Sequence, residues 1–575
     1  MHESNSNSLQ HRALTVLAFV AAAFLIHALA LGNPFLIDDH SAIQEHPDVQ
    51  DLAGGLRLWT HHYWEGSPSL DDQLYRPVTV FSFWLSQRLT PDSAAGFRIV
   101  NILLLAAIAL CVVSWLKRYT GTLPALIAGA IVLTHPANTE AINHLVGRAD
   151  LLAVFGIVGF LALQANAQQT GWTWPRITGA AGLALVALGS KESGLALIPC
   201  AIAQGWVDSA NTDDVANYEP RPAGSGPDAV ERANACQTAL GVCPKRALFL
   251  ALFLPFAGYL AARLTVVGLP TGYAPATDDL TGNPLRGIGF FERLPDVLAV
   301  AWWYVRQFVW PWTTYNHTPA PNQVGQWNLL AVRGIMTYGL LLFIAIGGLR
   351  NRVPALVPII LLLAYLLIVG HLLTVTGAYA ANRLTVPTTA GFAMLLGLAL
   401  HGYLKSDTWH RRVIPAVVLI ATLAFAFQTA RANRAWSSEL ARMHADVQAD
   451  DEDPIALYWL GQAQLGYDND AAVSHLKRAH ALAPQSNQAA AALADALLAT
   501  GDDRAAWKLY DELLTRDAPM TDAQRANAAM TAFNTRRYDR ARELVRSLPA
   551  DLAQPIEHAL RAIGETAAPD DQALP

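Results

Sequence analysis

Long apolar runs, separated by short polar segments, constrain this chain more than any other feature of its sequence. A helix needs about 20 apolar residues to cross a bilayer, and on that basis we expect about 11 spans. Residues 297–312 form a further apolar piece that contains Arg306 and Gln307, so we expect a re-entrant or interfacial segment there. The sequence therefore predicts an all-α, polytopic membrane helix bundle. The expected spans are residues 13–31, 97–116, 122–137, 141–168, 177–190, 194–207, 246–266, 329–349, 353–375, 385–404 and 413–430.

The composition supports a membrane protein and excludes two other classes. Charged residues make up only 15% of the 575 residues, whereas soluble domains typically contain about 25%. A net charge of -6 without a cluster of Lys and Arg argues against a nucleic-acid partner. The four cysteines have neither metal-ligand spacing nor the pattern of a disulfide framework. They are Cys111, Cys200, Cys236 and Cys243.

Positively charged residues between the runs set the expected orientation. Lys and Arg are enriched in cytoplasmic loops, which places the N-terminus and the polar, flexible loop 208–245 inside. Loop 32–96 and the C-terminal region then lie outside. Loop 32–96 is rich in Trp and Tyr, which favour the membrane interface, so we expect short helices on the outer leaflet. No small-residue cleavage site interrupts residues 13–31, so we expect that run to be retained. The orienting residues are Lys117, Arg118, Arg176, Arg350, Arg352, Lys405, Arg411 and Arg412.

The C-terminal region, residues 437–575, reads as a soluble α-solenoid. Gly466 and Gly501 are spaced like Pro484 and Pro519, with a separation close to the 34-residue tetratricopeptide period. Each repeat of such a solenoid buries its apolar face only by stacking on a neighbour, and the stack forms a concave binding surface. We therefore expect this region to recruit a polypeptide acceptor or partner.

Polar and charged residues of the membrane region converge on the external side. Asp38 and Asp39 follow the first run, and carboxylates at that position suit general-base work on an acceptor hydroxyl. Several cations on one membrane face suit a phosphate. The alternative is structural: Asp is favoured at helix starts, and Arg148 with Asp150, or Lys191 with Glu192, would form internal ion pairs. The candidate site residues are Asp38, Asp39, His40, Arg76, His135, Glu140, Arg148, Asp150, Lys191, Glu192, Arg263 and Arg383.

Two of these choices carry further expectations. Within the expected span 141–168, His144 and Arg148 are four residues apart and should share one side of a continuous helix. His135 alone is more typical of a hydrogen-bonding residue at a helix end than of a metal ligand. The carboxylates could hold a divalent cation together with a phosphate, but the sequence shows no dedicated metal site, so no cofactor is assigned.

The order of short motifs along the chain resembles the transmembrane and tetratricopeptide-repeat O-mannosyltransferases. These belong to the broader GT-C glycosyltransferases, which include the protein O-mannosyltransferases. At residues 382–388 the chain lacks the Glu and the Tyr of the family's pattern, which leaves acceptor and sugar specificity open. The motifs are Asp38-Asp39-His40, Tyr75-Arg76-Pro77-Val78-Thr79, His135-Pro136, Thr139-Glu140-Ala141, Gly147-Arg148-Ala149-Asp150, Ser190-Lys191-Glu192, Arg263-Leu264-Thr265, Asn283-Pro284, Asn382-Arg383-Leu384 and Asn433 to Trp436.

The resemblance implies a GT-C-type domain over residues 1–436 that uses a polyprenyl-phosphate sugar. By that likeness Asp38 is the base of an inverting transfer, and Asp39 and His40 position the acceptor. The implied ligands of the lipid phosphate are Arg76, Arg148, Lys191 and Arg383. An Ala-rich chain with few Lys is typical of bacteria, so we expect a bacterial inner membrane with the site and repeats in the periplasm. Two alternatives stay open: transfer to a lipid or surface glycan, and a non-catalytic repeat scaffold.

Overall fold

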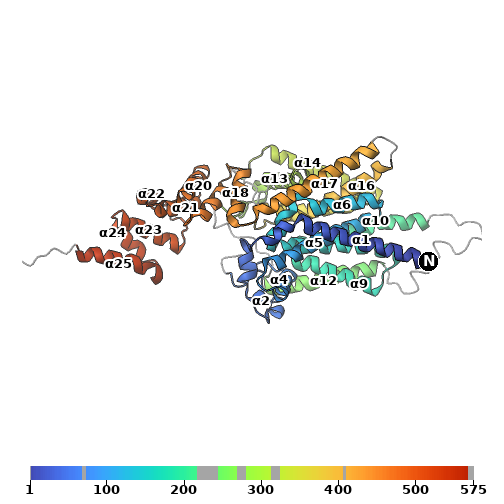
Figure 1. Cartoon of the computed structure of the whole chain (residues 1–575), viewed down its shortest axis with the longest axis horizontal. Coiled ribbons are helices and arrows are strands. Elements are labelled where there is room, and N and C mark those ends of the chain that lie inside the picture. The colour runs from blue at the N-terminus through green and yellow to red at the C-terminus, as the bar shows by residue number, and fades with distance from the viewer. Residues whose placement is uncertain are drawn as a thin grey trace, which may run out of the picture.

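The computed structural model describes residues 2–67, 73–216, 244–268, 280–311, 324–405 and 410–566, and they contain helices but no strand. Figure 1 shows a bundle of long helices, with an arm of short helices that extends from one end of it. The predicted all-helical fold is confirmed. The bundle helices are α1 (His2–Ile26), α5 (Ala94–Leu116), α6 (Thr122–Thr134), α8 (Arg148–Thr170), α9 (Trp174–Ser190), α10 (Leu197–Ala216), α12 (Pro244–Val266), α13 (Phe290–Val309), α14 (Leu329–Asn351), α15 (Leu356–Val369), α16 (Val386–Leu404) and α17 (His410–Ala435).

Several of these helices are long and apolar enough to cross a membrane. In the described part of the chain six stretches meet both criteria, and three shorter apolar helices accompany them. The chain is therefore a multi-pass membrane protein. The six are Ala94–Leu116, Leu145–Thr170, Pro244–Val266, Leu329–Asn351, Asn382–Leu404 and Val413–Ala435; the shorter ones are Gln10–Ile26, Thr122–Thr134 and Leu356–Val369.

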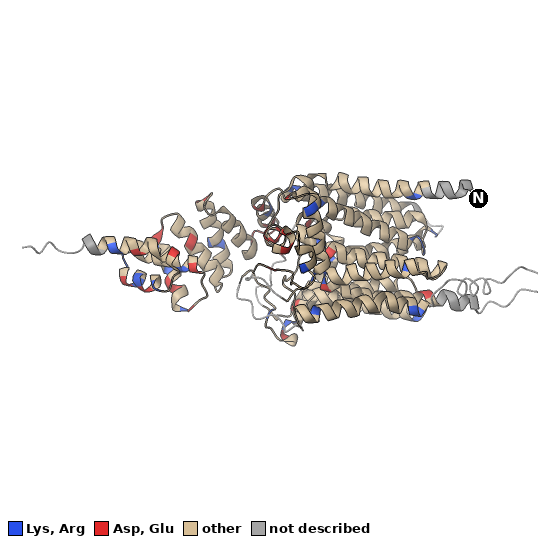
Figure 2. Ribbon diagram, turned by 90° about the horizontal axis from the view of Figure 1, so that it is seen from below, with Lys and Arg blue, Asp and Glu red and all other residues tan. Residues whose placement is uncertain are grey.

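The outer surface of the bundle is apolar. Large hydrophobic side chains of α14 and α17 are exposed, among them Met336, Phe343, Leu423 and Phe427. Figure 2 shows that charged residues gather toward the two ends of the bundle and leave its middle largely uncharged. An exposed apolar belt of this kind is expected where lipid, rather than water, surrounds the helices.

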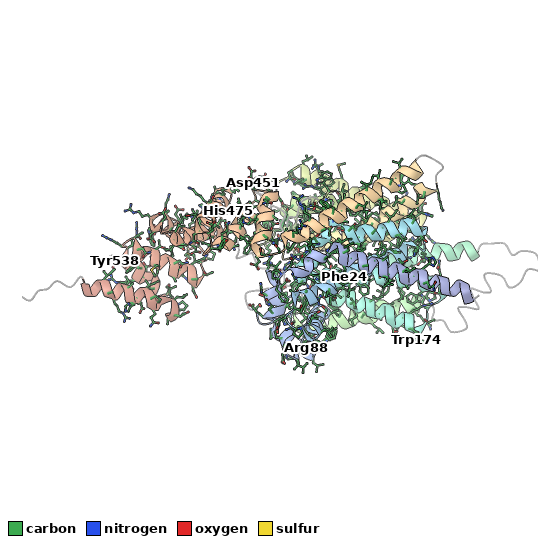
Figure 3. All side chains as sticks on the ribbon, viewed as in Figure 1. Phe24, Arg88, Trp174, Asp451, His475 and Tyr538 are labelled. Atoms are coloured by element: carbon green, nitrogen blue, oxygen red, sulfur yellow. The ribbon has the colours of Figure 1, made fainter. Side chains whose placement is uncertain are left out.

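The segment around Asp38 lies at the end of the bundle from which the arm extends. Figure 1 places α2 and α4 at that end and the N-terminus at the other. In Figure 3, Arg88 of α4 marks the arm end and Trp174 of α9 the opposite end. The short elements here are η1 (Ala28–Gly32), the π-helical turn η2 (His40–Gln44), α2 (Pro47–Gln50), α3 (Gly54–Arg57) and α4 (Pro77–Leu89). The elements from η2 to α4 are the short helices expected in loop 32–96, whereas η1 falls at the end of the expected span 13–31.

Contacts shortly before α13 and near its end both lie at the arm end of the bundle. Shortly before the helix, the Asn283 side chain donates a hydrogen bond of 2.7 Å to the Thr376 carbonyl, in the loop between α15 and α16. Near the end of the helix, Phe308 stacks on His135, which follows α6, with ring centroids 5.2 Å apart. The re-entrant or interfacial placement expected for residues 297–312 stays a prediction, and residue 312 lies outside the described residues.

The arm consists of helices that pack on their neighbours in chain order. Gly466 and Gly501 each adopt a left-handed φ of +81° after the first helix of a pair, a conformation that Gly adopts without strain. Asp468 and Asp502 then cap the second helices, accepting from the Ala471 and Ala505 amides. The arm helices are α18 (Glu439–Ala449), α19 (Pro454–Gln464), α20 (Asn469–Leu482), α21 (Asn487–Ala499), α22 (Asp503–Thr515), α23 (Asp522–Asn534), α24 (Tyr538–Val545) and α25 (Ala550–Thr566). Their assignment as tetratricopeptide repeats stays a prediction.

Most of the polar loop expected at residues 208–245 lies outside the described residues, as do Cys236 and Cys243. Its beginning differs from the expectation, because α10 continues from Leu197 to Ala216. Asp208 is buried in this helix and pairs with Arg118 at 2.9 Å. Residue 208 is therefore part of the bundle and not of a loop.

Candidate active site

Side chains from three distant helical segments fix the backbone that leads to Asp38. The Asn33 side chain donates to Asn143 Oδ1 at 2.7 Å, and the Asn143 side chain donates to Asn433 Oδ1 at 2.7 Å. The buried Arg98 guanidinium donates to the carbonyls of Asn33, Pro34 and Asn143. Because α5, the short helix α7 (Thr139–Asn143) and α17 supply these groups, the position of the loop depends on the folded bundle.

The two adjacent aspartates have opposite surroundings. Asp39 is fully buried, and its carboxylate accepts hydrogen bonds of 3.1 Å from the Leu36 and Val146 amides. Burial raises the pKa of Asp39, although His144 and these amides oppose the rise. The Asp38 side chain is 41% exposed. Asp38 is therefore open to a substrate, whereas Asp39 anchors the loop.

His144 lies among three carboxylates. Its Nε2 is 3.8 Å from Asp38 Oδ2 and 4.0 Å from Asp39 Oδ1, and its Nδ1 is 4.0 Å from Glu140 Oε1. The indole of Trp436 stacks on the imidazole, with centroids 6.3 Å apart. His144 thus lies between the exposed aspartate and a buried Glu, beyond hydrogen-bond distance of both, and is covered by the segment that joins α17 to α18.

The continuous helix expected over residues 141–168 is wrong at this point. α7 ends at Asn143, His144 is extended with φ -83° and ψ 103°, and a 3-10 turn (Leu145–Gly147) precedes α8. The physical reason is that Asp39 binds the Val146 amide from the side, which removes that donor from a helical ladder. Because the helix is interrupted here, the His144 side chain is directed toward the aspartates and the Arg148 side chain into the bundle.

Three cations of the predicted set pair with carboxylates that are distant in sequence. Internal ion pairs were the structural alternative, but the partners differ from the sequence neighbours that this alternative named. Each pair joins different elements, including the 3-10 turns η5 (Glu192–Ala196) and η6 (Asn382–Thr385). The pairs are Arg383 with Glu140 at 2.7 Å, Lys191 with Asp150 at 2.6 Å and Arg76 with Glu192 at 2.7 Å.

Burial and neighbouring charges act together in this cluster. Burial lowers the pKa of Lys191 to about 8; Asp150 opposes the shift, and Arg76 and Arg383 add to it. Burial would raise the pKa of Glu140, but Arg383 and His144 together lower it to about 2. The cluster therefore holds closely spaced cations whose charge a bound anion would favour.

Arg148 and His135 have surroundings that hold helices together. Arg148 is fully buried and donates to Asn101 Oδ1, Ser86 Oγ and backbone carbonyls of α4 and α5. His135 is fully buried, its Nε2 donates to the Phe308 carbonyl, and burial lowers its pKa to about 4. These contacts do not support the phosphate role implied for Arg148, and they fit the helix-end role expected for His135.

The remaining predicted residues lie at the edges of the cluster. His40 is exposed, with Nδ1 2.5 Å from Gln44 Oε1 and Nε2 3.7 Å from Glu439 Oε1. Arg263 donates to the Gln73 carbonyl at 3.2 Å. Burial would raise the pKa of Glu192, but Arg76 and, to a smaller extent, Arg263 lower it. No three His, Cys, Asp or Glu side chains of the described chain are arranged to hold a metal ion.

Reasoning from sequence missed two residues that shape this site. Arg98 is a lone cation near the start of the apolar run 97–116, and a charge at such a position is itself a signal of a buried role. Glu439 is the first residue of α18 and looks like an ordinary acidic residue at a helix start. Nothing in the sequence indicated its contact with the Asp38 loop.

The chain is similar to several protein O-mannosyl-transferases, which confirms the resemblance inferred from the motifs. It is 33% identical to Tmtc1 of Drosophila melanogaster over 211 residues, which are 35% of this chain and 24% of that protein. It is 28% identical to a Caenorhabditis elegans relative over 193 residues (32% and 27%) and 27% identical to TMTC3 of Mus musculus over 203 residues (34% and 22%). The chain spans about a quarter of the length of these curated relatives. No protein-family model matches it.

Proposed function

We propose that the chain is a membrane glycosyltransferase that moves a mannose-type sugar from a polyprenyl phosphate to Ser or Thr hydroxyls of a polypeptide. The observation that carries the proposal is the exposed carboxylate of Asp38, beside His144 and a cluster of cations at one end of the bundle. The names of the similar proteins support the sugar and the acceptor class. The polyprenyl donor is what the family resemblance implies, and the cluster of cations is consistent with its phosphate.

In the proposed step Asp38 removes the proton from the acceptor hydroxyl as its oxygen attacks the anomeric carbon. The new C–O bond forms on the face opposite the phosphate, the bond to the phosphate oxygen breaks, and the configuration inverts. The leaving phosphate takes up the bond's electron pair, so its negative charge grows in the transition state. Arg76, Lys191 and Arg383 would stabilise that charge. Each would then donate hydrogen bonds to the phosphate as well as to its carboxylate partner.

We place the site and the arm on the periplasmic side of a bacterial inner membrane. Support comes from the positive-inside rule, because Lys117, Arg176, Arg350 and Lys405 all follow expected spans on the side away from Asp38. A polypeptide acceptor is favoured over a lipid because α18 contacts the Asp38 loop directly. An acceptor bound along the arm would reach the base without crossing the membrane.

The test is sugar transfer in membranes that contain the chain. Radiolabelled polyprenyl-phosphate mannose, glucose and arabinose are supplied separately, and label is followed into precipitated protein, extracted lipid and surface glycan. We expect mannose in the protein fraction, in a linkage released by β-elimination. Label confined to lipid or glycan would overturn the polypeptide acceptor. Consumption of none of the donors would overturn the enzyme and favour a repeat scaffold.

Transfer should also decline at alkaline pH because of Lys191. Its pKa of about 8 in the free protein means that the ammonium loses its charge as pH rises through that value. The kcat/KM for the donor reports groups of the free enzyme, so it should fall above pH about 8. Lys191→Arg retains a cation at every accessible pH and should move the decline upward. A profile that is identical for the two proteins would exclude Lys191 from donor binding.

A further inference from the structure

The residue before Asp38 holds a backbone conformation that its side chain disfavours. Ile37 has a left-handed φ of +51°, which for a β-branched residue is a genuine outlier. Such a conformation is strained and persists only where the surroundings enforce it. The backbone conformation of Ile37 sets the direction of the Asp38 side chain. A contact that holds Ile37 in this conformation therefore also orients Asp38.

Glu439, the first residue of α18, makes a contact that can hold Ile37 in this conformation. Its Oε1 accepts a hydrogen bond of 3.0 Å from the Ile37 amide and lies 3.7 Å from His40 Nε2. One carboxylate oxygen thus contacts the residues on both sides of the Asp38-Asp39 pair. A hydrogen bond to a charged acceptor is stronger than one between neutral groups, so this contact offsets the strain at Ile37.

Other residues between the end of α17 and the start of α18 also pack against the site. Trp436 is buried against His144, and the Arg442 guanidinium of α18 lies over the Trp436 ring, 5.2 Å from its centroid. Asn433 closes the network that reaches Asn33. The start of the arm is therefore packed onto the loop and onto the imidazole beside Asp38, on both sides of Glu439.

We propose that Glu439 is a positioning residue that orients Asp38 and makes sugar transfer depend on the docking of α18 against the bundle. With α18 docked, the Ile37 amide has its charged acceptor and the loop keeps its left-handed turn. When α18 moves away, the acceptor leaves, Ile37 returns to an ordinary φ and the Asp38 carboxylate turns from the acceptor hydroxyl. This inference rests on the proposed function for its effect on transfer, but not for its effect on the loop.

The experiment compares Glu439→Ala and Glu439→Gln in the full-length chain. Glu439→Ala should lower kcat for transfer by about 10- to 100-fold, because small displacements of a reacting group have effects of that size, and leave KM for the donor unchanged. Glu439→Gln keeps an oxygen acceptor for the Ile37 amide and should retain most of the activity. Glu543→Ala, at an exposed Glu of α24, is the matched control and should behave as wild type.

A rescue separates positioning from a general loss of structure. Gly adopts a positive φ without strain, so Ile37→Gly should restore several-fold of the activity that Glu439→Ala removes. A merely structural role for Glu439 predicts no rescue, because Gly adds no contact to α18. Unchanged kcat in Glu439→Ala, or loss that neither Gln nor Ile37→Gly repairs, would overturn the proposal.

Hydrogen exchange tests the loop without any need for turnover. In Glu439→Ala the Ile37 amide should exchange about tenfold faster, and in Glu439→Gln close to the wild-type rate. If wild type transfers no sugar while this exchange pattern holds, the proposed function fails and the contact between α18 and the loop stands. If transfer occurs and exchange at Ile37 is the same in all variants, the positioning role fails alone.

Discussion

Replacement of Asp38 by Asn is expected to lower sugar transfer by about 10²- to 10⁴-fold, the usual contribution of a general base. Asn has nearly the same shape but cannot accept the proton from the acceptor hydroxyl. The side chain is 41% exposed, so the change leaves no buried group without a partner and should not alter the unfolding temperature. Transfer rates at saturating donor, together with thermal unfolding in detergent, check both parts.

Asp39→Asn is the matched comparison because it changes the neighbouring carboxylate in the same way. Asp39 accepts two backbone amides, and Asn would turn its NH₂ group toward one of them. One buried amide then loses its acceptor, which costs about 1–3 kcal/mol, so this variant should unfold at a lower temperature. Full transfer by Asp38→Asn would remove Asp38 as the base and leave the pair as a structural anchor of the loop.

The fold of the bundle could be predicted from sequence because each span is a local property. Most runs of apolar residues became helices, although the run 141–168 is broken at His144. The apolar piece that holds Arg306 and Gln307 became α13, at the arm end. Ends were less accurate: α15 stops at Val369, and a left-handed His371 follows it. Helix ends depend on contacts from other segments, which a run of apolar residues does not encode.

The site was predicted as a set of residues but not as an arrangement. Asp38 was chosen over Asp39 by family likeness, and what distinguishes them physically is the Val146 amide, 107 residues away. Glu140 and Arg383 are 243 residues apart, so no spacing rule could pair them. The sequence neighbours Arg148 and Asp150 lie on one helix, yet they do not pair: Arg148 is buried among acceptors of α4 and α5, and Asp150 binds Lys191.

Breaking the ion pair between Arg383 and Glu140 should have the largest effect on stability. The Glu140 carboxylate is almost fully buried; Arg383 binds it with both its guanidinium, at 2.7 Å, and its backbone amide, at 3.0 Å. Arg383→Met leaves that carboxylate with the amide and with His144 at 4.0 Å. Removal of one partner of a buried pair typically costs about 3–5 kcal/mol, which a large decrease in the unfolding temperature would reveal.

The double variant Glu140→Gln with Arg383→Met separates stability from catalysis. Gln keeps an acceptor for the Arg383 backbone amide and removes the buried charge, so most of the lost stability should return, as it often does when both members of a buried pair become neutral. Transfer should stay low, because the phosphate would still lack a cation. The ion pair between Arg118 and Asp208, whose atoms are 2.9 Å apart, gives the control because it lies far from Asp38 in the bundle. Relative to Arg118→Met alone, Arg118→Met with Asp208→Asn should restore stability and transfer together. Equal recovery of transfer in both double variants would show that Arg383 only holds the bundle together.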